Sequence, residues 1–235
     1  IYRSRYLHLI AVEERRCFAL AMKVGVIAGS PVDTQMGVEV LNVRGIETYA
    51  YPAAKAAREQ TEFQMQSSEV RTNRIQRLIQ SAQSDGMNAM MIYCNSLSST
   101  VDMEMLSRKL GIKIVTPLMA YACYAKQYQV LSVLAGNNQG LAGIERAILQ
   151  SNLSCTVVGA SLLPMVVEIE AQTLPEQIVE KFHLMSLFEF FESAGAEAFI
   201  LGCTHFPYIR RVLDEKVRIP ILDPADKMYE LLVND

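Results

Sequence analysis

The chain has 235 residues, of which 51% are hydrophobic and 20% are charged, and its formal net charge is −3. This length is enough to bury a sizeable core in one large domain or two small ones. No uninterrupted apolar run approaches the roughly 18 residues that a membrane helix needs, and the lysines and arginines are scattered rather than gathered in a stripe, so the composition argues against a membrane or nucleic-acid partner.

Residues 1–21 are expected to form an N-terminal extension. Their Glu-Glu-Arg-Arg block at 13–16 interrupts the apolar stretch, which makes them a poor export signal. The first convincing strand begins directly after Met22, and we therefore interpret Met22 as the natural start. A helix packed on the body of the protein is the competing interpretation.

From Met22 onward, short β-rich runs alternate with segments of helical spacing, a pattern typical of parallel βαβ units. Strands are expected at 23–28, 46–51, 89–93, 112–115, 129–135, 155–160, 198–201 and 219–222. The clearest helix is predicted over 67–86, where Ile75, Ile79 and Ala82 lie on one face. A second helix is predicted over 175–194.

Five cysteines are present, an odd number with no CxxC spacing. This pattern favours reduced thiols in a cytoplasmic protein over a disulfide framework or a zinc site. Cys123 falls in a helical segment and Cys155 opens a predicted strand, so both are interpreted as small hydrophobic residues of the core.

Cys94 and Cys203 lie in a different context. In "AMMIYCNSLSST" (89–100) and "AFILGCTHFPYI" (198–209), an apolar strand runs into a cysteine, and small polar residues follow it. Ligands of parallel sheets bind beyond the carboxyl ends of strands, where helix N-termini favour negative charge and thiolates. Two such turns predict one site built from both halves of the chain.

Together with "VGVIAGSPVDTQMG" (24–37), these blocks resemble the signature blocks of the aspartate/glutamate racemase superfamily. The resemblance implies an α/β fold of two similar domains, each with a parallel sheet in an α/β/α arrangement, and an active site in the cleft between them. We place the first domain at 22–116 together with 206–235, and the second at 117–205. The resemblance also implies a reaction without pyridoxal phosphate, metal or other cofactor, and frequently a homodimer.

Inverting an α-carbon requires a base on one face to remove the proton and an acid on the other face to return one. Cys94 and Cys203 would supply this pair. By resemblance, the α-carboxylate and amino group of an amino acid substrate would be held by Ser30, Asn95, Ser96 and Thr204. His205 resembles the residue that assists the second thiol, although a structural or capping histidine is the alternative.

Two loops depart from the family pattern. Glutamate racemases carry an Asp-Ser-Gly turn after the first strand, whereas this chain has Ala-Gly-Ser at 28–30. Asp33 could replace the missing carboxylate as a catalytic residue, or it could be a helix N-cap. A Pro-Tyr-Gly turn that often meets the substrate has Tyr51 as its nearest counterpart, so Tyr51 is a candidate binding residue. Lys55, Arg58 or Gln60 could contact a side-chain carboxylate of the substrate. The alternative is that these side chains face solvent.

The segment "LAGNNQGLAGIERAI" (134–148) follows a strand and opens a helix. Its glycines and asparagines offer an anion-binding turn that could hold a nucleotide phosphate or lie near the substrate, or could simply be structural.

The predicted function is cofactor-independent racemisation of an amino acid by two cysteines, with glutamate or aspartate as the favoured substrate. The alternatives are a related enzyme, such as a maleate isomerase, hydantoin racemase or decarboxylase, and a non-catalytic protein that binds an amino acid.

Overall fold

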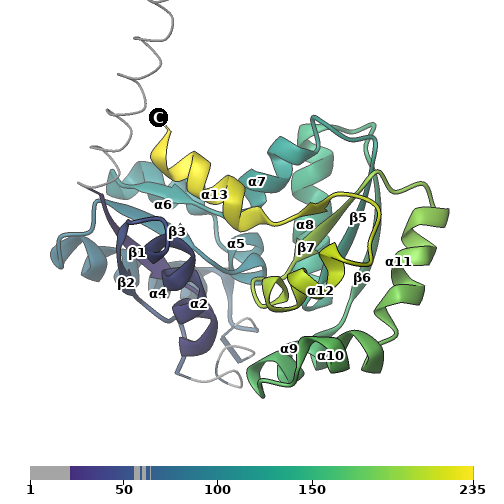
Figure 1. The fold of residues 1–235 in the computed structure, drawn as a ribbon. Coiled ribbons are helices and arrows are strands. Elements are labelled where there is room, and N and C mark those ends of the chain that lie inside the picture. The colour runs from purple at the N-terminus through teal and green to yellow at the C-terminus, as the bar shows by residue number, and fades with distance from the viewer. Residues whose placement is uncertain (1–21, 56–58, 60–61, 64, 235) are drawn as a thin grey trace, which may run out of the picture.

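The computed structural model describes residues 22–234 except 56–58, 60–61 and 64. The expected extension 1–21 therefore lies outside the described residues. Within them, two four-stranded parallel sheets have the orders β2-β1-β3-β4 and β6-β5-β7-β8 (Figure 1). The strands are β1 (Lys23–Ile27), β2 (Glu47–Ala50), β3 (Ala89–Ile92), β4 (Lys113–Val115), β5 (Val130–Ala135), β6 (Thr156–Ser161), β7 (Ala198–Gly202) and β8 (Ile221–Leu222).

Every predicted strand is present, with ends that differ by one or two residues. The central strands are buried along nearly their whole length, because helices cover both faces of a parallel sheet. All four residues of β3 and all five of β7 are buried. The predicted α/β class with two parallel sheets is confirmed.

Helices surround both sheets. They are α2 (Pro31–Asn42), α4 (Ser68–Ser84), α5 (Asn95–Thr100), α6 (Met103–Leu110), α7 (Pro117–Tyr124), α8 (Asn138–Ser151), α9 (Leu163–Glu170), α10 (Pro175–Lys181), α11 (Leu184–Ser193), α12 (Arg210–Asp214) and α13 (Pro224–Val233), with a short 3-10 helix η1 (Phe206–Ile209). The predicted helix at 67–86 is α4, which ends just before Gly86 at φ +90°. None of the described helices is long and apolar enough to cross a membrane.

The single helix predicted over 175–194 is wrong, because the chain forms α10 and α11 with a break between them. His183 adopts a left-handed conformation with φ 49° at the start of α11. The break lets α10 pack against η1, while Phe188 of α11 packs edge-on against Phe199 of β7, with ring centroids 4.6 Å apart. Both pieces carry apolar residues, so periodicity alone did not reveal the break.

The C-terminal segment is shared between the two halves. β8 pairs with β7 in the second sheet, whereas α13 packs against α7, β4 and β3 beside the first sheet. We expected all of 206–235 to belong to the first domain, but β8 of this segment pairs with the second sheet. The other domain boundaries remain a prediction. Where α5 and α8 meet, a Cβ on Gly143 would lie 2.2 Å from Ser99 Cβ, so the lack of a side chain there permits the close approach.

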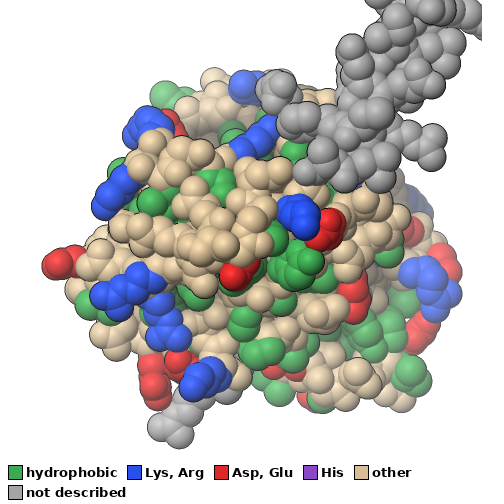
Figure 2. Space-filling model, turned by 90° about the vertical axis from the view of Figure 1, so that its left-hand side faces the viewer, with side chains coloured by type: hydrophobic (Ala, Val, Ile, Leu, Met, Phe, Trp, Pro, Cys, Tyr) green, Lys and Arg blue, Asp and Glu red, His purple; other side chains and the backbone are tan. Residues whose placement is uncertain are grey.

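Charged side chains of both signs are interspersed over the molecular face that Figure 2 shows. This face carries no continuous basic stripe of the kind that nucleic-acid-binding proteins use.

Candidate active site

A pocket of about 460 Å³ is lined by both halves of the chain, a volume in the range typical of small-molecule sites. The first half contributes Asp33, Met65, Cys94, Asn95 and Ser96; the second contributes residues 136–140, Leu163, Val166, Val167, Glu170 and residues 202–205. Cys94 follows β3 and Cys203 follows β7, so both lie beyond the carboxyl ends of their strands. The tertiary structure thus brings the two cysteine turns to one pocket.

Cys94 is the residue immediately before α5 and is only 4% exposed. Its Sγ lies 3.5 Å from Ser96 Oγ. Burial raises the pKa of the Cys94 thiol, and the negative charge of Asp33 contributes, so that the pKa reaches about 12. Cys94 therefore holds its proton at neutral pH.

Cys203 belongs to a chain of three side chains. Its Sγ lies 3.7 Å from His205 Nδ1, and His205 Nε2 lies 3.2 Å from Glu170 Oε1. Burial lowers the pKa of the His205 imidazole, but hydrogen bonds with Cys203 and Glu170 outweigh it and raise the pKa to about 10. The hydrogen bond from His205 lowers the pKa of Glu170. The imidazole of His205 thus lies between the Cys203 sulfur and the Glu170 carboxylate.

Sequence reasoning missed Glu170. It is the last residue of α9 and lies 35 residues before His205. No motif marks it, and only the packing of α9 beside η1 reveals it.

Asp33 and Ser30 form a capping box at the start of α2. Ser30 is the N-cap, and Asp33 accepts hydrogen bonds from Gly29 N at 3.0 Å, Ser30 N at 2.6 Å and Ser30 Oγ at 2.9 Å. The alternative that Asp33 is itself the N-cap is therefore wrong. Ser30 is the N-cap, and Asp33 is the third residue of the helix, where it completes the capping box. Asp33 still lines the pocket and is 1% exposed, and burial raises the pKa of its carboxyl group. Ser30 is not among the residues that line the pocket.

Asn95, Ser96 and Thr204, which are predicted from the sequence as binding residues, all line the pocket. Tyr121 donates its hydroxyl hydrogen to Asn95 Oδ1 at 2.8 Å, which orients the amide. Asn95 Nδ2 is buried and has no hydrogen-bond partner among the described residues. A buried donor without a partner is costly, and a ligand carboxylate would satisfy it.

Tyr51 lies apart from these residues. It is not among the pocket residues, and its hydroxyl donates to Asp85 Oδ2 at 2.8 Å. The Lys55 backbone nitrogen donates to Glu59 Oε2, whereas Arg58 and Gln60 lie outside the described residues.

The loop at 136–140 is both a structural turn and a wall of the pocket. Asn137 is the N-cap of α8, and its Oδ1 accepts a hydrogen bond from Gly140 N at 2.8 Å. A Cβ on Gly136 would lie 2.8 Å from Cys203 Sγ, so only glycine permits this close approach of the backbone to the thiol. In the described part of the chain, no three His, Cys, Asp or Glu side chains are grouped as a metal site requires.

Comparison with known proteins gives concordant matches. The family model described as Asp/Glu/Hydantoin racemase matches residues 21–232. A glutamate racemase of Limosilactobacillus reuteri (strain DSM 20016) is 26% identical over 141 residues, which are 58% of this chain and 52% of the relative. The chain thus spans about half the length of the curated relatives it matches.

Two solved structures show the same fold. Glutamate racemase from Francisella tularensis subsp. tularensis SCHU S4, in complex with D-glutamate, has a TM-score of 0.69 at 16% identity, covering 90% of this chain and 79% of that one. An aspartate racemase homologue from Pyrococcus horikoshii OT3 has a TM-score of 0.67 at 17% identity, covering 90% and 99%. At these identities the likeness establishes the fold.

Proposed function

The chain belongs to the Asp/Glu/hydantoin racemase family, and on that premise we propose that it racemises an α-amino acid by proton transfer between two cysteines. The observation that carries the proposal is that Cys94 and Cys203, which end strands of different sheets, line the same pocket. One thiol for each face of an α-carbon is the minimum that inversion requires.

The two sulfurs have unequal surroundings, which assigns them starting roles. Cys203, whose Sγ lies 3.7 Å from His205 Nδ1, is the sulfur placed to remove the α-proton with the imidazole beside it. Cys94, a buried thiol with a raised pKa, delivers its own proton to the opposite face of the resulting carbanion. After one turnover Cys203 carries the proton and Cys94 is the thiolate, so the enzyme is ready for the reverse reaction.

Binding of the substrate carboxylate is supported by the unpartnered Nδ2 of Asn95 and by the N-terminus of α8, which shares the pocket. Free backbone N–H groups at a helix start favour an anion. An acidic substrate, glutamate or aspartate, is the sequence-based expectation. Its second carboxylate would meet amides, hydroxyls and backbone N–H groups, because the described lining contains no lysine or arginine.

The test is incubation with single amino acids in deuterated water. Starting from one enantiomer, early product should carry deuterium at the α-carbon while recovered substrate remains mostly protiated, and the bias should reverse for the other enantiomer. Cys94→Ser and Cys203→Ser should each abolish racemisation, because serine is a far weaker acid and base at neutral pH. Near-normal racemisation in both directions by either variant contradicts the two-thiol mechanism. Binding of an amino acid without any α-proton exchange supports a non-catalytic binding protein.

Hydantoin racemisation is the second candidate, because Leu163, Val166 and Val167 of α9 give the pocket an apolar wall. It uses the same two thiols, and exchange with a 5-substituted hydantoin but with no amino acid would select it. The proposal also includes operation without a cofactor, a homodimeric assembly and a cytoplasmic location, which rest on the resemblance and the cysteine content.

A further inference from the structure

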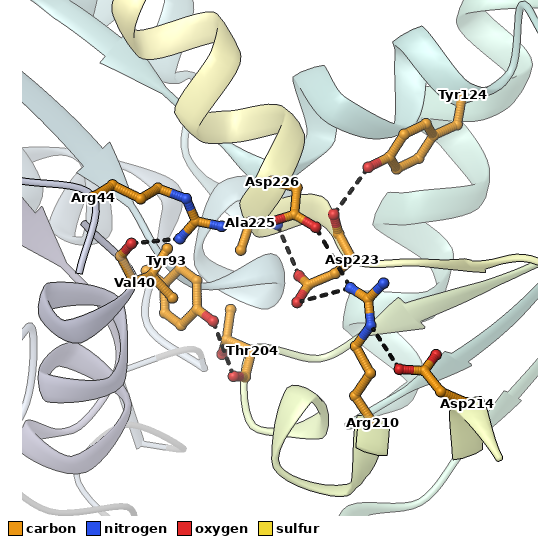
Figure 3. Close-up of polar contacts among 10 residues, drawn as sticks. All are labelled: Val40, Arg44, Tyr93, Tyr124, Thr204, Arg210, Asp214, Asp223, Ala225 and Asp226. Carbon is orange, nitrogen blue, oxygen red and sulfur yellow. Dashed lines mark hydrogen bonds and ion pairs between the residues drawn. The ribbon is translucent and has the colours of Figure 1, made fainter. Parts of the chain in front are cut away.

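We propose that Tyr93 is a positioning residue that holds the two cysteine segments at a fixed spacing across the pocket. It immediately precedes Cys94, and its hydroxyl donates to the backbone carbonyl oxygen of Thr204, 3.3 Å away, immediately after Cys203 (Figure 3). One side chain thus joins the two turns, covalently at one end and through a hydrogen bond at the other. The inference rests on the proposed racemisation, because the spacing matters only if both thiols act on one α-carbon.

The Tyr93 ring is held firmly by the first half of the molecule. It is 2% exposed, and the Tyr93 backbone nitrogen donates to Ile27 O at 2.7 Å, which extends the pairing of β3 with β1. Helix α2 lies directly against the side chain, because a Cβ on Gly37 would be 2.8 Å from both Tyr93 Cβ and Cγ. The position of the hydroxyl is therefore determined by the first sheet and α2.

The acceptor belongs to the segment that carries the catalytic groups of the second half. The Thr204 carbonyl lies between Cys203 and His205, so a shift of this peptide moves the thiol and the imidazole together. Tyr93 is absent from the pocket lining, so it acts on the reaction through the position of the two cysteine turns.

Further polar contacts join the segment after α2 to α13 and α12. Arg44, after α2, pairs with Asp226 of α13, and Asp226 also pairs with Arg210 of α12 at 3.5 Å (Figure 3). These pairs are partly exposed, and exposed ion pairs contribute little individually. The buried hydroxyl of Tyr93, in contrast, joins the two cysteine turns directly.

The test compares Tyr93→Phe with Tyr124→Phe. Tyr124 is a matched control because its hydroxyl also donates to a backbone carbonyl, that of Asp223 at 2.9 Å (Figure 3), and it does not line the pocket. Both variants retain the ring and should fold with similarly lowered unfolding midpoints. Tyr93→Phe should lower kcat about ten- to a hundredfold, as misplacement of reacting groups does, with KM changed by less than about twofold.

A kinetic isotope effect separates positioning from a merely structural role. With α-deuterated substrate, the isotope effect on kcat should be larger in Tyr93→Phe than in the wild type, because proton transfer has become slower relative to the other steps. Unchanged kcat and isotope effect in folded Tyr93→Phe, or an equal loss in Tyr124→Phe, overturns the inference while leaving racemisation intact. A wild-type protein that exchanges no α-proton with any substrate overturns the proposed function and this role with it.

Discussion

Replacing Gly136 by alanine should strongly slow the proposed racemisation without unfolding the protein. The new Cβ would lie 2.8 Å from Cys203 Sγ and 3.4 Å from Val166 Cγ2, whereas ordinary contact begins at 3.4 Å. The sulfur must therefore move by about 0.6 Å or more, because repulsion rises steeply inside the contact distance. The least costly relief is to twist the Cys203 side chain away from its rotamer, at about 0.5–1.5 kcal/mol.

The cost to catalysis is larger than the cost to stability. A displacement approaching 1 Å from the productive geometry lowers a rate by about a hundredfold. We therefore expect Gly136→Ala to lower kcat by about one to two powers of ten. The free energy of unfolding should fall by only about 1 kcal/mol.

The assay is the initial rate of racemisation in both directions, followed by circular dichroism, together with thermal unfolding. Gly140→Ala, in the first turn of α8, is the control, since its Cβ would meet Asn137 Oδ1 at 3.3 Å and Asn95 Cβ at 3.9 Å but no sulfur. It should lose much less activity. Two results would refute the reasoning. In one, folded Gly136→Ala keeps more than about half of the wild-type kcat, a much smaller loss than expected; in the other, both variants lose activity equally.

Four further outcomes are expected. His205→Asn should lower turnover by about two to three powers of ten with folding intact, and a nearly unchanged rate would make His205 a structural residue. The folded pKa of His205 is raised from 6.5 to about 10, so its contribution to stability is complete below pH 6.5 and is lost as the pH rises through 10. Urea unfolding should therefore show that the stability difference between wild type and His205→Asn shrinks over this window, whereas a constant difference would contradict the linkage. Asp33→Asn should lower turnover more than stability, although the loss of acceptors in the capping box should also cost about 1–2 kcal/mol; a lowered unfolding midpoint with normal turnover would limit Asp33 to the capping box. Tyr51→Phe should leave kcat and KM nearly unchanged, and a large rise in KM would return Tyr51 to the substrate site.

Features that depend on local pattern could be predicted from the sequence. A strand buried on both faces of a parallel sheet must be apolar along its length, so the runs ending at Cys94 and Cys203 were recognisable as strands, and the polar residues after each cysteine marked a site. The α4 helix was recognisable because its apolar face recurs with helical spacing and Gly86 follows it.

Features that depend on which distant segments meet could not be predicted in this way. Glu170 reaches His205 from 35 residues away, and Tyr93 reaches Thr204 from 111 residues away. The sequence also did not reveal that β8 pairs with the second sheet, or that the Tyr51 hydroxyl donates a hydrogen bond to Asp85. The break at His183 could not be predicted either. Its positive φ separates α10, which packs on η1, from α11, which packs on β7.

The sequence by itself thus determined the elements of this protein and the two thiols that end its strands, because hydrophobic burial and turn chemistry act over a few neighbouring residues. Only the tertiary structure decided how the two thiols differ. Burial and Asp33 raise the pKa of Cys94, whereas Cys203 lies beside His205 and Glu170, and these groups meet through space although the chain order keeps them apart.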